Sequence, residues 1–253
     1  AFFIGAAGVG VFGAKEAGFL LLGANLTAAV LLGILFHVFG KETAQEETRK
    51  RERPAHSPLT TEFPQCVRNA FSSTLGVCAY VILFSVLTRL ADCSGLLPFL
   101  VNVLSSLLPG ENAPVLCRSF CVGLMELSTG TAAIRDGVSS PLSLPLAAFI
   151  LGWGGLSVHC QSLPFWREAG VPSGPYLRAK FLHGLLSAGI TALATLLFPL
   201  SLPAMAPVTP LAAPSLLGQE VLALWGMAGI YFFFFDQKRV EKSKSTRYNK
   251  RIP

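Results

Sequence analysis

Two interruptions in otherwise apolar sequence constrain this chain more than any other feature. The first is MELSTG at residues 125–130, and the second is FILGWGGLSVHCQ at residues 149–161. Each contains glycines, hydroxyl groups and an ionisable side chain. A helix that faces lipid does not tolerate such breaks, because hydrocarbon offers no partners to the freed backbone groups. We therefore expect both segments to lie inside a membrane protein, where paired breaks are typical of a transporter's solute site. We predict that residues 113–130 and 141–161 approach each other near the middle of the membrane and that their polar breaks face a shared cavity.

The composition supports a membrane protein. Of the 253 residues, 52% are hydrophobic and 13% are charged, and the mean hydropathy is +0.56, whereas a soluble domain has roughly 25% charged residues. The charges that give the net value of +6 are concentrated in residues 41–53, 166–180 and 236–251. No run of basic residues is interleaved with aromatic ones as in single-strand binding proteins. We therefore expect no nucleic-acid partner.

The sequence contains none of the common motifs of catalysis or metal binding. There is no G-x-S-x-G, no HExxH, no P-loop and no pair of carboxylates in a shared context. The six cysteines form no CxxC pair and no Cys/His spacing typical of zinc. We predict that the chain is not an enzyme, and we expect no metal and no cofactor.

The apolar segments predict an all-α integral membrane protein with about five full transmembrane helices. A helix needs about 20 residues to cross the hydrocarbon, so the apolar residues 1–12 make only a partial helix at the N-terminus. The full spans are predicted at residues 19–39, 66–90, 141–161, 179–200 and 216–235. The span at residues 141–161 is broken by its glycines.

Four regions are expected along the chain. They are a helical pair at residues 1–40, whose first helix is truncated; a charged cytoplasmic linker at 41–65; a transmembrane domain at 66–235; and a basic cytoplasmic tail at 236–253. Within the transmembrane domain, residues 96–130 hold two apolar arms that are too short to cross, so we predict a re-entrant or half-helix hairpin. Residues 13–18 are interpreted as a polar turn and residues 164–178 as a loop rich in proline and glycine.

The basic residues set the orientation in the membrane. Basic loops lie on the cytoplasmic side, so residues 41–53 and the tail must be separated by an even number of crossings. Four predicted spans satisfy this condition when the hairpin enters and leaves on one side. The uncharged residues 201–215 are then expected on the outer face.

Glu126 is the strongest single candidate for a functional residue. A carboxylate within a membrane segment usually faces a cavity, pairs with a cation, or binds a proton or an ion. The alternative is a structural salt bridge to Arg118 or Arg135. The hydroxyl groups that follow Glu126 are expected to hydrogen-bond the solute or to cap the broken helix, and both roles can coexist. The candidates next to it are Ser128, Thr129 and Gly130.

The second interruption supplies five further candidates. Gly154 and Gly155 either unwind the helix or allow a neighbouring helix to approach closely. Ser157 and Gln161 are four residues apart and share a helical face, with His159 between them. His159 could bind a ligand or relay protons, although a lone histidine near a helix end is more often interfacial.

The sequences GLMELSTG at residues 123–130 and GWGGLSVHCQ at residues 152–161 resemble the C-terminal half of the sporulation integral membrane proteins of the YlbJ type. These proteins contain the "nucleoside recognition" or Gate domain. The opening segment AFFIGAAGVGVFGAKEAGFLL and the later spans also resemble that family, so the resemblance covers nearly the whole chain. Cys160 departs from the small residue expected at its position.

The resemblance implies a multi-pass protein of the bacterial inner membrane, built from two related halves, with residues 66–235 as its Gate-type domain. The N-terminal half is expected to be missing from this chain. The family is associated with spore formation and with moving dipicolinate, a small aromatic dicarboxylate. Gate domains also occur in concentrative nucleoside transporters and in ferrous-iron transporters.

We therefore expect a secondary transporter or permease for a small polar or anionic metabolite, similar to dipicolinate. Its partners would be the solute, a coupling proton or sodium ion, the lipid bilayer and the missing N-terminal half. An ionised Glu126 would repel a dicarboxylate, so this group should be protonated, ion-paired or bound to the coupling cation. The alternatives are a structural or assembly component of a sporulation membrane complex, and a nucleoside or metal-ion carrier that shares the Gate domain.

Overall fold

The structure is a computed structural model that describes residues 2–39, 59–137, 139–168, 172–198 and 200. Within these residues every regular element is a helix. The chain divides into two compact units, Ala1–Glu42 with Leu83–Pro207, and Thr43–Ile82 with Val208–Pro253. The predicted span at 216–235, the tail, the 201–215 loop and most of the charged linker lie outside the described residues. Both interruptions lie in the first unit.

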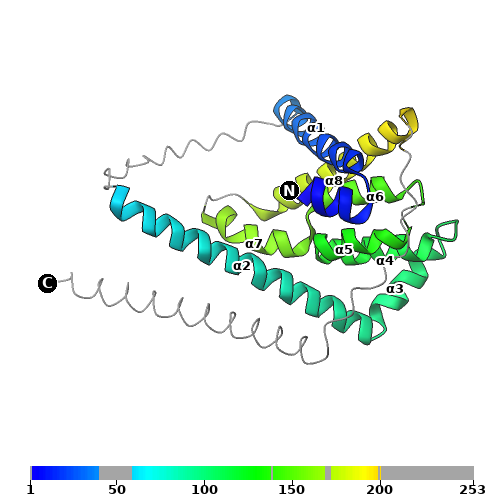
Figure 1. The fold of residues 1–253 in the computed structure, drawn as a ribbon, viewed down its shortest axis with the longest axis horizontal. Coiled ribbons are helices and arrows are strands. Elements are labelled where there is room, and N and C mark those ends of the chain that lie inside the picture. The colour runs from blue at the N-terminus through cyan, green and yellow to red at the C-terminus, as the bar shows by residue number, and fades with distance from the viewer. Residues whose placement is uncertain (1, 40–58, 138, 169–171, 199, 201–253) are drawn as a thin grey trace. The chain divides into compact units, whose positions relative to one another are not determined.

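The N-terminal pair consists of a π-helix, η1 (Phe2–Val11), and the long helix α1 (Lys15–Phe39) (Figure 1). The two helices fold back on each other and meet at glycines. A Cβ atom added to Gly8 would lie 2.7 Å from the Cα of Gly18, so any side chain there would push the pair apart. Because α1 begins at Lys15, the predicted polar turn at 13–18 is wrong over most of its length.

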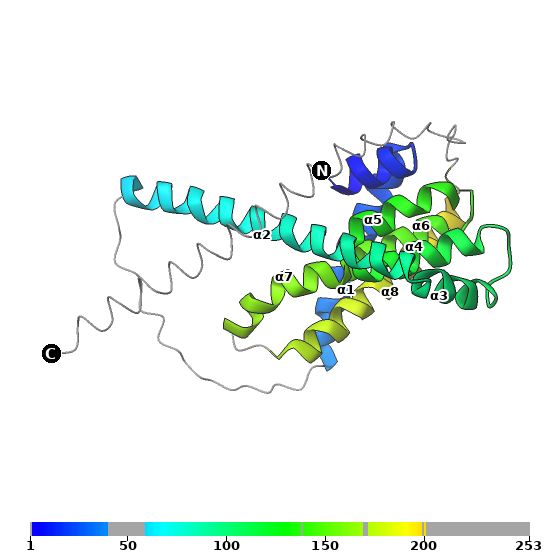
Figure 2. The same cartoon turned by 90° about the horizontal axis from the view of Figure 1, so that it is seen from below.

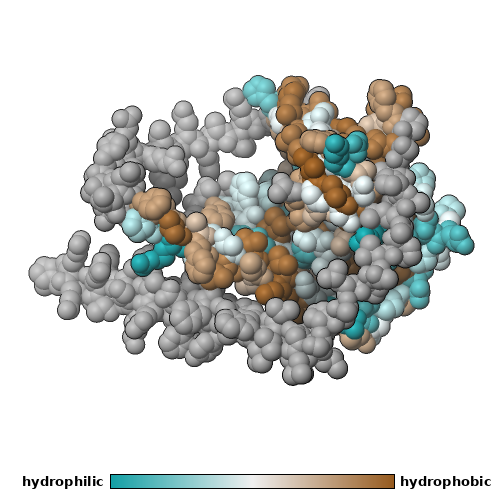
Figure 3. All heavy atoms as spheres, in the orientation of Figure 1, coloured by the Kyte–Doolittle hydropathy of each residue, from teal (hydrophilic) through white to brown (hydrophobic). Residues whose placement is uncertain are grey.

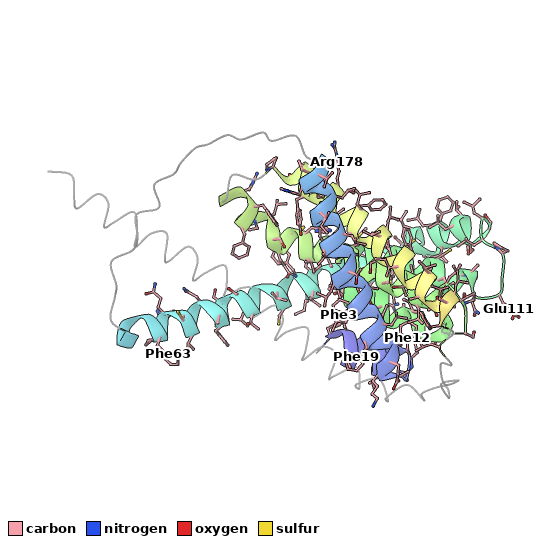
Figure 4. The ribbon with its side chains drawn as sticks, turned by 90° about the horizontal axis from the view of Figure 1, so that it is seen from above. Phe3, Phe12, Phe19, Phe63, Glu111 and Arg178 are labelled. Carbon is pink, nitrogen blue, oxygen red and sulfur yellow. The ribbon has the colours of Figure 1, made fainter. Side chains whose placement is uncertain are left out.

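Helix α2 (Leu59–Cys93) is longer than the predicted span 66–90 at both ends. The last residues of the predicted linker are therefore helical, and Pro64 is accommodated near the start of the helix. Its apolar side chains are exposed, for example Phe63 at 68% and Phe71 at 66%, and Phe63 projects from the ribbon in Figure 4. An apolar helix with so little burial fits contact with lipid.

The predicted hairpin contains two reversals of the chain. Helix α3 (Leu96–Ser105) packs against α4 (Ala113–Met125) (Figure 2), and these are the two short arms expected from the sequence. The chain then reverses again at Glu126. Helix α5 (Leu127–Ala133) and the 3-10 turn η2 (Ile134–Gly137) run back along α4. The second reversal was not predicted from the sequence.

The second of these reversals brings its two helices very close together. Gly130 of α5 lies directly against the backbone of Gly123 in α4, where a Cβ atom would overlap it. A Cβ atom on Gly137 would lie 3.2 Å from Cγ1 of Val115. The α4–α5 hairpin is therefore closed by small residues, as membrane helices often are.

The predicted broken helix is present as two helices, α6 (Ser143–Trp153) and α7 (Gly155–Glu168). Gly154 separates them with a φ of 90°, which is a conformation that favours glycine. Helix α7 continues through Pro164, and α8 (Ser173–Leu197) begins soon after it. The predicted loop at 164–178 is therefore wrong at residues 164–168 and 173–178, which are helical.

Helix α6 forms the centre of the first unit. Ala147, Ala148 and Ile150 are fully buried among residues of η1, α1 and η2. On its other side α6 meets α8 at Gly152 and Gly184, where an added Cβ atom on Gly152 would lie 2.8 Å from the Cα of Gly184. The helix that carries the break is therefore shielded on several sides by protein.

Four helical segments among the described residues are long and apolar enough to cross a membrane. They are Lys15–Val38, Phe63–Cys93, Ser143–Arg167 and Ser173–Leu197, and the third of these comprises α6 and α7. Apolar side chains cover the exposed surface of α1 in Figure 3. The predicted class, an all-α multi-pass integral membrane protein in contact with lipid, is confirmed.

Figure 4 shows Arg178 near the C-terminal end of α1, whereas Phe12 and Phe19 lie near the N-terminal end of that helix.

Candidate functional site at two helix breaks

Glu126 lies at the tip of the α4–α5 hairpin and is 2% exposed. Its Oε1 atom accepts a hydrogen bond from the backbone N–H of Ser128 (2.9 Å), and Oε2 accepts from the backbone N–H (2.7 Å) and the hydroxyl of Thr129 (2.9 Å). The carboxylate therefore caps the N-terminus of α5, where the first N–H groups have no partner within the helix. The sequence suggested a cap at this break but assigned it to the hydroxyl groups.

The expected alternative, a salt bridge from Glu126 to Arg118, is wrong. Both terminal nitrogens of Arg118 instead contact the two carboxylate oxygens of Asp92, each at 2.9 Å. Arg89 lies 3.3 Å from the same carboxylate. Within the described residues, no cation forms an ion pair with Glu126. The buried charge is balanced by backbone and hydroxyl donors.

The two interruptions are packed against each other, as we predicted for the hairpin and the broken helix. Gly155 has a φ of 79°, and a Cβ atom added to it would lie 3.1–3.2 Å from backbone atoms of residues 125–127. The indole N–H of Trp153 donates to the carbonyl of Leu124 at 3.3 Å. The tip of the hairpin and the break between α6 and α7 thus form one buried junction.

The polar candidates on α7 lie next to this junction. Ser157 is 1% exposed and its Oγ accepts a hydrogen bond from Nε2 of Gln161 at 3.2 Å. His159 is 2% exposed, and its Nδ1 lies 3.3 Å from the hydroxyl of Tyr176. The other ring nitrogen of His159, Nε2, is buried and has no hydrogen-bond partner in the described part of the chain.

The remaining candidates on α5 have mainly structural surroundings. Gly130 is buried against α4, Ser128 is partly buried and Thr129 is exposed. These residues lie beside Glu126, but their observed contacts are those of the α5 cap and the α4–α5 crossing. In the described residues, no three metal-binding side chains converge.

Sequence reasoning missed Lys180 and Tyr176 as members of the junction. Lys180 is partly buried, and its Cε lies 4.0 Å from the position that a Cβ atom on Gly154 would occupy. The sequence placed both residues in or beside a loop, because the proline and glycine residues before them hid the start of α8. The signal that could have found Lys180 is a cation within an otherwise apolar helix.

His183 connects three helices of the same unit. Its Nε2 lies 2.9 Å from the carbonyl oxygen of Asn25 in α1, and its Nδ1 lies 3.1 Å from the carbonyl oxygen of Gly152 in α6. Since a neutral imidazole has one N–H group, the ring donates to both carbonyls only when it carries two protons. His183 therefore ties α8 to the helix that carries the break.

A hollow of about 480 Å³ lies elsewhere, between the start of α6 and the end of α8. It is lined by residues 139–145 and by four residues of or after α8, and it includes none of the predicted candidates. The packed junction at the two breaks is thus separate from this hollow.

The fold and the junction define an α-helical membrane protein with a helical hairpin whose tip meets a discontinuous helix. No family model matches the chain, and no solved structure matches it. The chain is similar to the sporulation integral membrane protein YlbJ of Bacillus subtilis (strain 168), with 26% identity over 74% of this chain and 50% of that protein. The resemblance inferred from the two motifs is thereby confirmed. The chain spans about half the length of this curated relative.

Proposed function

We propose that the chain is part of a permease that carries a small polar or anionic metabolite across the bacterial inner membrane. The observation that supports this function best is the contact between the hairpin tip at Glu126 and the break at Gly155. Broken helices bring backbone N–H and C=O groups into the membrane interior, where a solute can use them. The N-terminal half expected from the resemblance would complete the path.

A role linked to spore formation is supported by the similarity to YlbJ, whose name describes a sporulation protein. The resemblance stated above suggests dipicolinate, or a similar small dicarboxylate, as the solute. The structure relieves one difficulty with this choice, because the charge of Glu126 is balanced by three donors at the start of α5. Coupling to a proton or a sodium ion remains part of the proposal.

A second candidate function is a structural or assembly component of a sporulation membrane complex. One observation favours it, namely that the buried carboxylate of Glu126 caps a helix instead of facing an open cavity. In that case the junction would hold the fold together and would need no solute.

Uptake by the full-length natural protein in proteoliposomes distinguishes these functions. The solutes are radiolabelled dipicolinate, uridine and Fe²⁺, each measured with and without proton and sodium gradients and against empty vesicles. The permease account predicts saturable dipicolinate uptake. Uptake of uridine or Fe²⁺ alone would favour the nucleoside or metal-ion carrier, and uptake of none of the three would favour the assembly component.

A further inference from the structure

We propose that the break between α6 and α7 is an anion site, in which Lys180 and His159 hold a carboxylate of the solute. This inference rests on the proposed function and deepens it, because it assigns the charge selectivity of the permease to Lys180. The site combines three features, namely the start of α7, Lys180, whose Cε atom lies close to Gly154, and the buried Nε2 atom of His159 on α7.

The two helices that begin at the junction differ in how their N-termini are satisfied. The first N–H groups of a helix lack partners within it, and the helix dipole makes this end favourable for negative charge. Helix α5 begins after Glu126, whose own carboxylate fills this position. Helix α7, which has 14 residues, begins after Gly154, which has no side chain that could do so. The N-terminus of α7 therefore receives no side-chain cap from the residue that precedes it.

Lys180 supplies positive charge at this open end. Its Cε atom, which comes from the neighbouring helix α8, lies 4.0 Å from the position that a Cβ atom on Gly154 would occupy. Within the described residues, it has no carboxylate within ion-pair distance. A cation that is partly removed from water inside an apolar helix is stabilised by a counter-charge. An anionic solute would provide that charge.

His159 supplies a second, directional contact. Its Nδ1 faces the hydroxyl of Tyr176 at 3.3 Å, and if the hydroxyl donates there, the ring proton resides on Nε2. That N–H group is buried without a partner, and an unpaired buried donor is costly. A ligand oxygen would satisfy it. The ring of Trp153 stands edge-on with its centroid 4.3 Å from that of His159, so it forms an apolar wall of the site.

These groups favour an anion over a cation or a neutral solute. The groups assigned to the site are donors, namely the ammonium, the imidazole N–H and the first N–H groups of α7, whereas both oxygens of Glu126 already accept hydrogen bonds within the chain. A cation would be repelled by Lys180, and a neutral amide would leave its charge unbalanced. The chemical class that fits all three donors is an organic carboxylate.

Binding of a charged and a neutral probe to the purified full-length protein tests this inference. The probes are dipicolinate and its neutral diamide, pyridine-2,6-dicarboxamide, measured by isothermal titration calorimetry. Lys180→Met keeps the approximate length of the side chain but removes its charge. It should weaken dipicolinate binding by about tenfold or more, because the hydrogen bond between the charged ammonium and the carboxylate is lost. Binding of the neutral diamide should be unchanged. Lys180→Arg should retain affinity within a few-fold.

Arg178→Met is the matched control, because it removes the same charge from an exposed position two residues away on α8. It should bind both probes like the parent.

His159→Gln is a second, independent variant and should also weaken dipicolinate binding. Thermal unfolding is used to verify that each protein is folded. Equal affinity of Lys180→Met and the parent for dipicolinate would overturn the inference, as would equal loss of both probes or no binding of dipicolinate to the parent. If dipicolinate binds in this charge-dependent way but is not taken up into proteoliposomes, the permease function is overturned and the anion site is retained.

Discussion

Glu126 is buried, and no cation of the described residues is in ion-pair contact with it. Its two carboxylate oxygens accept three hydrogen bonds from the residues that begin α5. Hydrogen bonds from N–H groups to an ionised acceptor are stronger than neutral ones, and the α5 N-terminus adds a favourable dipole. The position of a charge in this membrane segment is therefore explained by local backbone geometry. A role in ion coupling is an additional proposal that the cap neither requires nor excludes.

Glu126→Ala should destabilise the protein by about 1–2 kcal/mol, because the cap of α5 is lost. The measurement is denaturant unfolding in detergent micelles, followed by circular dichroism. Glu111→Ala is the control, since Glu111 is exposed in the connection between α3 and α4 (Figure 4). The control should change stability by no more than about 0.5 kcal/mol. Equal stability of the two variants would contradict the capping role.

Glycine contacts determine how the helices approach one another. Three helix pairs meet at paired glycines, and each pair is too close for a Cβ atom: η1 with α1, α4 with α5, and α6 with α8. Helix association in lipid depends on close van der Waals packing, because lipid tails are as apolar as the side chains. Small residues at these crossings therefore stabilise the unit more than larger apolar residues would.

Gly152→Ala should destabilise the crossing of α6 and α8 by about 1–3 kcal/mol, the usual cost of overpacking. The added Cβ atom would lie 2.8 Å from the backbone of Gly184, which has no flexible side chain that could move away. Gly189→Ala on α8 is the matched control, since nothing lies within 4 Å of its added Cβ atom. Thermal unfolding of the purified proteins measures the difference. A melting temperature for Gly152→Ala as high as that for Gly189→Ala would contradict the close contact between Gly152 and Gly184.

The ion pair between α2 and α4 provides a third comparison. Arg118→Gln should destabilise the protein by about 2–3 kcal/mol, because it removes a two-pronged partner of Asp92 at a partly buried position. Arg89→Gln should cost no more than about 0.5–1 kcal/mol, since the Arg89 side chain is 76% exposed. Unfolding in denaturant measures both. A larger loss for Arg89→Gln would reverse the order of importance assigned to the two arginines.

At the scale of the molecule, the sequence predicted the fold class, a break within residues 152–155 and the meeting of the two interruptions. These features follow from apolar length and from the backbone groups that a break exposes, both of which are visible in one sequence. The extent of α7 and α8 was missed because proline and glycine predict loops in soluble proteins, whereas Pro164 is accommodated within a membrane helix. The second reversal, at Glu126, depends on tertiary packing of Gly130 on Gly123.

The candidate site was predicted less completely than the fold. Ser157, His159 and Gln161 were identified because they follow the break directly in the sequence. Lys180 and Tyr176 reach the same junction from α8, and no spacing within one sequence reveals a contact between two helices. The capping role of Glu126 was missed for a related reason, since the direction of its side chain depends on the extended backbone at that residue.

The central claim is that the junction of the two breaks carries the solute, and Gly155→Ala in the full-length protein tests it most directly. The substitution places a Cβ atom within 3.1 Å of the hairpin tip and requires a left-handed conformation that alanine rarely adopts. Dipicolinate uptake into proteoliposomes is compared with Gly189→Ala and with Arg118→Gln, the latter as a destabilised variant away from the breaks. We expect the uptake rate of Gly155→Ala to fall by about tenfold or more, and to fall further than that of Arg118→Gln. The reason is that a small displacement of binding groups lowers the rate strongly even where the protein stays folded. Uptake by Gly155→Ala equal to that of Gly189→Ala would contradict the central claim.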